Sequence, residues 1–339
     1  MRVVPQRWSM AILRISLVFL ALFGLLAAAA LWLRAAPGQS HAGPLPPLTS
    51  AQLATAGRLQ ADVTFLAQGP RDVTHQIHLK ASADHIVAEL TRAGYQPRRL
   101  PYQARQYPVE NLEVVLPGTT RAAEVVVIGA HYDSVPETPG ADDNASGVAL
   151  LLELARRLNG RPLARTVRFV AFTNEEPPWF RGPFMGSYVY AQALAREKVQ
   201  VTAMISLEML GFYDPAPGTQ RYPVPGLAKL YPDTADFVAF VGNLEARPVV
   251  QRAIGAFRAA AKFPSQSIAA PAFVTGIDFS DHASFWEAGF PDALMITDTS
   301  FLRNRHYHEP TDRPETLDFS RMARLVDGLQ AVVVELADR

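Results

Sequence analysis

The chain has 339 residues, of which 49% are hydrophobic and 19% are charged, a composition that excludes a disordered or fibrous protein. Its 32 Lys and Arg residues equal its 32 Asp and Glu residues in number. This balance argues against nucleic acid as a partner, because nucleic-acid-binding proteins need a basic surface. The chain contains no Cys, which excludes disulfides, thiol nucleophiles and Cys-ligated zinc, so any metal ligands must be His, Asp or Glu.

The N-terminal segment has the pattern of a membrane or export signal. Residues 15–33 form an uncharged apolar run, which at about 1.5 Å per residue is long enough for the ~30 Å core of a bilayer. Arg residues precede the run, and this positive charge predicts that the rest of the chain lies outside the cytoplasm, in the periplasm or extracellular space. We expect residues 1–36 to be a single-pass anchor in the cytoplasmic membrane, whereas cleavage before Gly43 would release a secreted protein.

The rest of the chain reads as a linker and one folded domain. Residues 37–50 are rich in Pro and predict a stiff, exposed linker. In residues 51–339, apolar spacing predicts in turn a helix at 73–93, strands at 111–116 and 124–130, a helix at 146–158, strands at 166–173 and 201–207, a helix around 250–261, a strand at 292–297 and a helix around 322–336. This order predicts an α/β fold, with a mostly parallel mixed sheet covered by helices on both faces.

Polar residues stand where the predicted strands end, and such sheets bind ligands at the carboxyl ends of their strands. His131 and Asp133 follow the strand 124–130 and share a face, so Asp133 has the spacing to hold the second ring nitrogen of a metal-bound His131. Asp142 and Asp143 open the helix 146–158. Each pair taken alone is also explained by capping of a strand or helix end.

Further carboxylates follow the next two strands. Glu175 and Glu176 are adjacent, and two carboxylates at a buried strand end repel each other unless a cation or a shared proton compensates. Glu208 ends the strand 201–207, and a His-rich loop around His308 comes late in the chain. Together these residues match a site for two divalent ions with a bridging carboxylate, further His and carboxylate ligands and one unbound Glu as a base.

These stretches resemble the co-catalytic di-zinc exopeptidases typified by bacterial leucyl aminopeptidase, which have glutamate carboxypeptidase and glutaminyl cyclase as relatives. The resemblance covers roughly residues 75 to 335 and rests on motifs that occur in the family's order. They are Gly129-Ala130-His131-Tyr132-Asp133-Ser134, Gly140 to Gly147, Asn174-Glu175-Glu176, Ser206-Leu207-Glu208-Met209, Ser280-Asp281-His282 and Tyr307-His308-Glu309-Pro310-Thr311-Asp312.

The resemblance implies a role for each of these side chains. His131 and Glu208 would bind one zinc ion, Glu176 and His308 the other, and Asp143 would bridge the two. Glu175 would be the general base, and Asp133 would orient His131. The peptide bond between Asp143 and Asn144 would be cis, as in relatives. Co or Mn are possible substitutes for zinc, because sites built from oxygen and nitrogen ligands accept several divalent metals.

The chain also departs from the family pattern. Ile277 stands about where some relatives carry a Tyr that stabilises the oxyanion, which leaves His282, beside Asp281, or a nearby Tyr as a guess for that role. The loop 177–184 carries aromatic residues that either wall a substrate pocket or pin the loop to the core. The loop 213–232 is long enough to shape the rim of a cleft.

We therefore expect residues 51–339 to be a zinc-dependent aminopeptidase that acts on peptides with a free N-terminus. One alternative is a relative with other chemistry on the same fold. A glutaminyl cyclase of this type generally works with one zinc ion, and a carboxypeptidase needs a basic pocket, for which Arg181 and Arg303 are candidates. The other alternative is a non-catalytic, receptor-like homologue.

Overall fold

The computed structural model describes residues 6–224 and 226–339, and the chain divides into two units, residues 1–36 and 37–339. The first unit contains the helix α1 (Gln6–Arg34), which includes the apolar run of the sequence. Among the residues that the structure describes, however, no helix is long and apolar enough to cross a membrane. The membrane anchor expected from the sequence for residues 1–36 stays a prediction.

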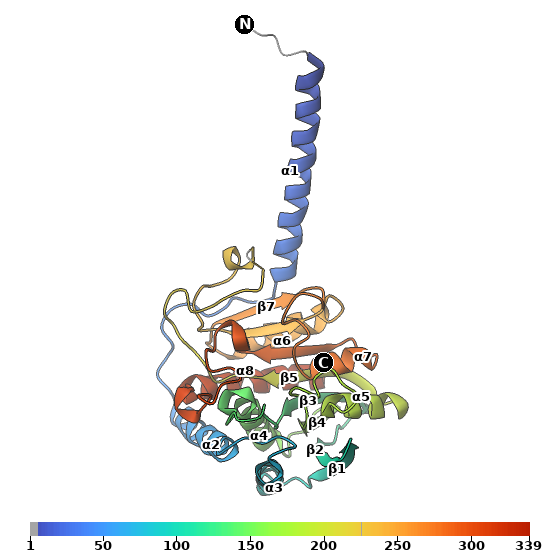
Figure 1. Cartoon of the computed structure of the whole chain (residues 1–339), viewed down its shortest axis with the longest axis vertical. Helices are drawn as coiled ribbons and strands as arrows, with labels where there is room; N and C mark the ends of the chain where they lie inside the picture. Colours follow the sequence, from blue (N-terminus) through green and yellow to red (C-terminus); the bar gives the residue numbers. More distant parts are fainter. Residues whose placement is uncertain (1–5, 225) are drawn as a thin grey trace. The chain divides into compact units, whose positions relative to one another are not determined.

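The second unit is built on one sheet of eight strands in the order β1-β2-β4-β3-β5-β8-β6-β7 (Figure 1). The strands are β1 (Arg98–Ala104), β2 (Tyr107–Leu116), β3 (Arg121–His131), β4 (Arg165–Phe172), β5 (Gln200–Glu208), β6 (Val238–Gly242), β7 (Ser265–Ala269) and β8 (Ala293–Thr297). The four adjacent strands β4, β3, β5 and β8 are parallel. Antiparallel pairs join β1 to β2, β2 to β4 and β6 to β8, so the sheet is mixed, as predicted.

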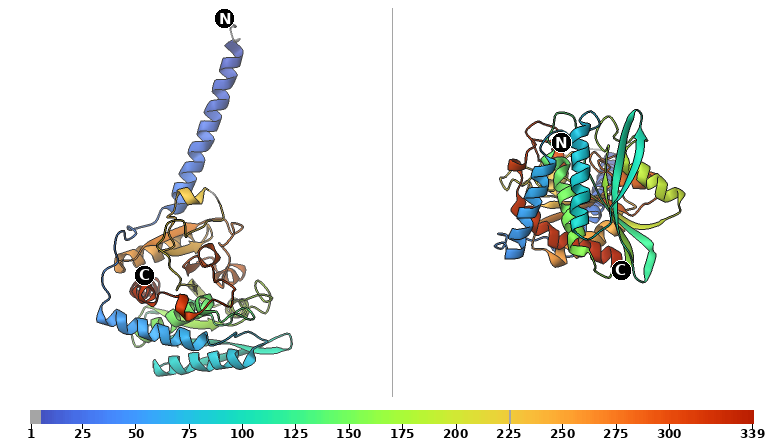
Figure 2. Two further views of the ribbon diagram at one scale, coloured as in Figure 1. Left: turned by 60° about the vertical axis from the view of Figure 1, so that its left-hand side comes forward. Right: turned by 90° about the horizontal axis from the view of Figure 1, so that it is seen from below.

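Helices pack on both faces of this sheet. On one face, Tyr190 of α5 and Phe285 of α7 pack against Val127 of β3 and Phe172 of β4. Figure 2 shows α2, α3 and α4 together on the opposite side of the sheet from α5. The helical segments of this unit are α2 (Ser50–Leu66), α3 (Gln76–Arg92), η1 (Ala141–Ser146), α4 (Gly147–Leu158), α5 (Gly186–Arg196), η2 (Leu227–Lys229), α6 (Arg247–Ala260), α7 (His282–Glu287), η3 (Ser300–Leu302), η4 (Pro314–Thr316) and α8 (Phe319–Asp338).

The segment that the sequence predicts to be an exposed linker packs in part against the domain. The Arg258 side chain donates hydrogen bonds to the backbone carbonyls of Pro37 and Gly38. The backbone N–H of Ser265 donates to the Ser40 hydroxyl at 2.9 Å. Thr49 then caps helix α2 through its side chain, which accepts a hydrogen bond from the N–H of Gln52. Proline stiffens this segment, but these bonds, and not stiffness alone, fix its course.

The central strands end at one edge of the sheet because they are parallel. β3, which is apolar on both faces, ends at His131, and β5 ends at Glu208. β4 ends at Phe172, three residues before Glu175. This edge is where a sheet of this type holds its ligands, and it carries the polar side chains singled out in the sequence.

Candidate metal centre

The structure brings together at this edge all five predicted metal ligands, His131, Asp143, Glu176, Glu208 and His308. Two groups of three have their ligand atoms within 4.8 Å of one another: His131, Asp143 and Glu208, and Asp143, Glu176 and His308. Four of the five residues are buried, and His308 is partly exposed. Asp143 belongs to both groups, as the bridging position requires.

The two oxygens of Asp143 face different histidines. Oδ1 lies 3.3 Å from Nε2 of His131, and Oδ2 lies 3.2 Å from Nε2 of His308. A second carboxylate completes each side: Glu208 Oε2 lies 3.4 Å from His131 Nε2, and Glu176 Oε2 lies 3.2 Å from His308 Nε2. The arrangement is a pair of His-carboxylate sets that share one carboxylate.

The donor atoms of this cluster fit a pair of cations. Nε2 of His131, Nε2 of His308 and Oε1 of Glu176 are buried and have no hydrogen-bond partner among the described residues. Burial and the neighbouring Asp143 raise the pKa of Glu176 to about 8. Burial lowers the pKa of His308, but the nearby carboxylates of Asp143 and Glu176 outweigh it and raise this pKa to about 10. Without cations the cluster must therefore hold protons to offset its own charge.

Asp133 connects the end of β3 to the pair Glu175 and Glu176. Its Oδ1 lies 3.5 Å from Nδ1 of His131, on the side of the ring that faces away from Asp143. Its two oxygens also accept hydrogen bonds from the backbone N–H groups of Glu175 and Glu176, at 3.1 and 3.2 Å. The carboxylate of Glu175 lies 4.0 Å from Nε2 of His131. One buried carboxylate thus faces the second ring nitrogen of His131 and fixes the backbone of two acids beside it.

Hydrogen bonds between the segment η1 and other parts of the chain hold Asp143 in place. The carboxylate of Asp312 accepts hydrogen bonds from the N–H groups of Asp142 and Asp143, at 2.9 and 3.1 Å. Asn144 accepts from the N–H of Met209 and donates to the carbonyl of Leu207, which ties η1 to the end of β5. The peptide bond between Asp143 and Asn144 is cis.

A comparison with models of known protein families now identifies the family of the chain. Residues 111–333 match the model of peptidase family M28, which is well over half of the chain. The chain belongs to peptidase family M28. It is therefore a hydrolase of peptide bonds, and the resemblance to the di-zinc exopeptidases that its motifs suggested is confirmed.

The chain is also similar to individual proteins. An uncharacterized protein of Escherichia coli is 40% identical over 286 residues, which cover 81% of this chain and 87% of that protein. An aminopeptidase of Bacillus subtilis is 30% identical over 65% of this chain, a match that spans only 42% of that enzyme. Among solved structures, a zinc aminopeptidase of Bacillus subtilis has a TM-score of 0.66 at 16% identity, covering 84% of this chain and 95% of that chain, and so shares the fold.

A buried arginine of this M28 peptidase lies before the first motif and was missed in the sequence. Arg71 is completely buried. Its guanidinium donates to the carbonyl of Tyr132, between His131 and Asp133, at 2.7 Å, and to the carbonyl of Gly140, at the start of η1, at 2.6 Å. Burial lowers its pKa, while Asp312 and Asp133 act in the opposite direction. Arg71 links the two backbone segments that carry metal-ligand candidates and places a positive charge behind an acidic cluster.

Asp281 and His282 lie behind the cluster and not in it. Asp281 is fully buried with neither carboxylate oxygen hydrogen-bonded in the described part of the chain, and burial raises its pKa to about 7. Nε2 of His282 lies 2.8 Å from the carbonyl oxygen of Ile277, and its ring packs edge-on to Trp286. His282 does not line the cavity beside the cluster, so the oxyanion role guessed for it from the sequence does not fit this geometry.

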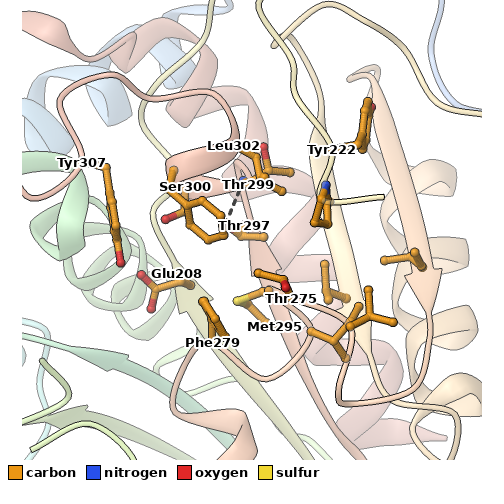
Figure 3. A pocket seen from close by; sticks show the side chains of 18 of the residues that line it. Glu208, Tyr222, Thr275, Phe279, Met295, Thr297, Thr299, Ser300, Leu302 and Tyr307 are labelled. Atoms are coloured by element: carbon orange, nitrogen blue, oxygen red, sulfur yellow. Dashed lines mark hydrogen bonds between the residues drawn. The ribbon is translucent and has the colours of Figure 1, made fainter. Parts of the chain in front are cut away.

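A cavity of about 280 Å³ opens directly onto the cluster, and Asp143, Glu175, Glu176, Glu208 and His308 line one end of it. Tyr307 also lines this end, with its ring stacked on that of His308 at a centroid distance of 3.7 Å. Figure 3 shows the Tyr307 and Glu208 side chains on the same side of the cavity. Burial and the nearby Asp143 raise the pKa of Tyr307, so its hydroxyl keeps its proton at neutral pH.

Proposed function

We propose that this M28 peptidase is a zinc-dependent aminopeptidase with two ions per chain. The observation that carries the proposal is Asp143, whose two oxygens each face a histidine that is itself paired with a second carboxylate. Imidazole and carboxylate ligands without Cys suit zinc and also Co or Mn. The zinc aminopeptidase of the same fold and the aminopeptidase relative support this choice.

The five ligands would divide into two sets around Asp143. His131 and Glu208 would hold one ion, and Glu176 and His308 the other. When bound, such ions lower the pKa of a water molecule and polarise the carbonyl of the scissile peptide bond. Asp133 would orient the ring of His131, and a carboxylate in this position also raises the basicity of the nitrogen that binds metal.

Glu175 is the carboxylate of the cluster that belongs to neither of the two ligand sets. Its backbone is fixed by Asp133, and its side chain lines the cavity at the edge of the cluster. We assign it the role of general base: it accepts a proton from the attacking water and then delivers this proton to the nitrogen of the leaving amine. The peptide bond breaks as that nitrogen is protonated.

The charge of the site favours an aminopeptidase over a carboxypeptidase. The acidic end of the cavity suits a substrate ammonium, and among the described residues that line the cavity none is Lys or Arg. Arg181 forms an ion pair with Asp278, and the buried Arg303 donates hydrogen bonds to Phe237 and Gln220. Neither arginine lines the cavity, so neither is placed to bind a substrate carboxylate.

The complete pair of ligand sets also argues against the remaining alternatives. A cyclase that works with one zinc ion does not require a second His-carboxylate set on the far side of Asp143. A receptor-like protein without metal would leave Nε2 of His131 and Nε2 of His308 buried among carboxylates with no function, at a cost in desolvation.

A panel of peptides tests the proposed reaction. We expect leucyl amides with a free amine to be hydrolysed at least 100-fold faster than their N-acetylated counterparts, because the blocked amine has no charge for the acidic end of the cavity to bind. Mass spectrometry identifies the products. Release of C-terminal residues from blocked peptides would show a carboxypeptidase, and conversion of N-terminal Gln to pyroglutamate a cyclase; either result would contradict the proposal.

We assign Tyr307 as the hydrogen-bond donor to the oxyanion that forms when water attacks the scissile carbonyl. Tyr307 would take the role of the Tyr that some relatives carry about where Ile277 stands, and its protonated side chain lines the acidic end of the cavity. Loss of a sole oxyanion donor costs about 10²- to 10³-fold in kcat. We expect Tyr307→Phe to lose less, roughly 10- to 100-fold, because bound ions share this task. An unchanged kcat, with unchanged metal content, would remove Tyr307 from the reaction.

A further inference from the structure

The strand register defines the floor of the cavity. Glu208 of β5 is the Cα partner of Thr297 in β8, Thr297 is the partner of Ala239 in β6, and Ala239 is the partner of Gln266 in β7. All four residues line the cavity. Because neighbouring strands lie about 4.8 Å apart, this row extends about 14 Å from the metal-ligand candidate Glu208 to its far end.

A second row runs beside the first and is apolar. Met295, Val241 and Ile268 are register partners across β8, β6 and β7, and each lies two residues from a member of the first row. Residues two apart in a strand share a face, so both rows belong to one face of the sheet. The other face of β6 packs on helix α6 through Phe240 and Phe257, whereas the cavity lies over the first face.

Loops cover this cavity. Tyr222, Leu227 and Tyr231, from the long loop 213–232, line it together with residues 274–277 and 279. The rings of Tyr222 and Tyr231 are stacked at 5.9 Å, and their hydroxyls donate to the carbonyls of Pro232 and Ser267. Figure 3 shows Tyr222 on the opposite side of the cavity from Glu208 and Tyr307. Beyond the acidic end the cavity is therefore lined mainly by apolar side chains, and the polar side chains among them, such as Thr275 and Gln266, carry no charge.

Charge is confined to one end. The charged and His side chains that line the cavity are Asp143, Glu175, Glu176, Glu208 and His308, all of them in the cluster. A peptide backbone lying further along the floor would lose hydrogen bonds to water and find few replacements, which is costly. An apolar side chain has no such cost and gains free energy with each methylene that it buries.

We propose that this cavity binds the side chain of the substrate's N-terminal residue and selects extended apolar side chains longer than that of leucine. The inference rests on the proposed aminopeptidase function and names its substrate class. A leucine side chain, with four carbons, fills only the first part of a floor about 14 Å long. Ala239 is the small residue in the middle of the first row, so a larger side chain at this position would narrow the cavity between its two ends.

A homologous series of substrates tests this proposal. Amides of alanine, norvaline, norleucine, 2-aminooctanoic acid and 2-aminodecanoic acid share one leaving group and differ only in side-chain length. We expect kcat/KM to rise by up to about fourfold per methylene, the factor that corresponds to ~0.8 kcal/mol per buried CH₂, and to continue rising beyond norleucine. Lysine amide, which is norleucine amide with a terminal ammonium, should be at least 100-fold slower than norleucine amide, because that charge would be buried unpaired.

A variant of Ala239 tests whether the side chain of the substrate lies in the cavity. Ala239→Phe places a ring in the middle of the floor, and the ratio of kcat/KM for the 2-aminooctanoyl amide to that for the alanyl amide should fall at least tenfold. The matched control is Ala123→Phe at an exposed position at the start of β3, which should leave this ratio unchanged. Metal content and circular dichroism check that both variants are folded.

The outcomes separate the two proposals. If no free-amine substrate is cleaved by protein that holds two metal equivalents, the proposed function fails. If short substrates are cleaved but kcat/KM does not rise beyond norleucine, the function stands and the long side-chain site is wrong. If Ala239→Phe leaves the ratio of the long to the short substrate unchanged, the side chain does not lie in this cavity, and this too overturns the inference.

Discussion

Replacement of Glu175 by Gln is expected to lower kcat by about 10²- to 10⁴-fold while both metal equivalents are retained. The range is that of general acid–base catalysis by a single positioned group. Gln keeps the size of the side chain and the backbone hydrogen bond to Asp133, but its amide cannot accept the proton of the attacking water. Steady-state kinetics on a free-amine substrate and elemental analysis of the same sample measure the two effects.

The control for this variant is Glu245→Gln, at an exposed position outside the cluster and the cavity. Surface changes of this kind usually alter stability by less than about 0.5 kcal/mol, and we expect wild-type kinetics. Full activity of Glu175→Gln would show that another group is the base. Loss of activity together with loss of metal would instead make Glu175 a ligand, contrary to the assignment of the five ligands.

Removal of metal is expected to abolish hydrolysis, and addition of zinc to restore it. The cluster consists of carboxylates and two histidines, and these side chains can accept a proton from water but do not lower its pKa or polarise the scissile carbonyl as a divalent ion does. Asp143→Asn is the decisive variant for this experiment. An Asn side chain offers one acceptor oxygen and no charge, so it cannot bridge the ion beside His131 and the ion beside His308, and zinc should not restore this variant.

The measurement is activity against added zinc after dialysis with a chelator, for wild type, Asp143→Asn and the exposed control Asp233→Asn. The control should follow the wild-type titration. Undiminished activity of chelated wild type, with no residual metal by elemental analysis, would contradict a metal-dependent reaction. Full recovery of Asp143→Asn would show that the shared carboxylate is not needed.

The metal-ligand candidates were predictable from the sequence for a topological reason. His131, Glu176 and Glu208 each stand at or just after the end of an apolar strand, and parallel strands end at a common edge. Asp143 and His308 are not on strands, and the sequence placed them only through motif order. The structure brings all five together, which shows that residue type and strand position together carry most of the information on this cluster.

Arg71 could not be found in this way. Its neighbours Gly69 and Pro70 read as a surface turn, and Arg is a residue that is rarely buried without a partner. Its partners are backbone carbonyls of residues 132, 139 and 140. Every residue has a backbone carbonyl, so the types of the partner residues do not indicate these bonds. Only the folded structure reveals them.

The cavity was missed because its floor depends on two short strands. β6 and β7 have five residues each, and neither was expected from the apolar spacing. β7 carries Ser and Gln residues, which weaken the strand pattern. Moreover, β6 runs antiparallel to β8, an arrangement that the alternation of predicted strands and helices did not suggest. The row from Glu208 to Gln266 depends on this strand register, and no short stretch of the sequence indicates it.

The most direct test of the two-ion cluster is anomalous diffraction at the zinc absorption edge from crystals of the zinc-loaded protein. We predict two peaks about 3.5 to 4 Å apart, the usual spacing of two-metal sites. One peak should contact Asp143, His131 and Glu208, and the other Asp143, Glu176 and His308. A single peak, or two peaks of which one does not contact Asp143, would contradict the account.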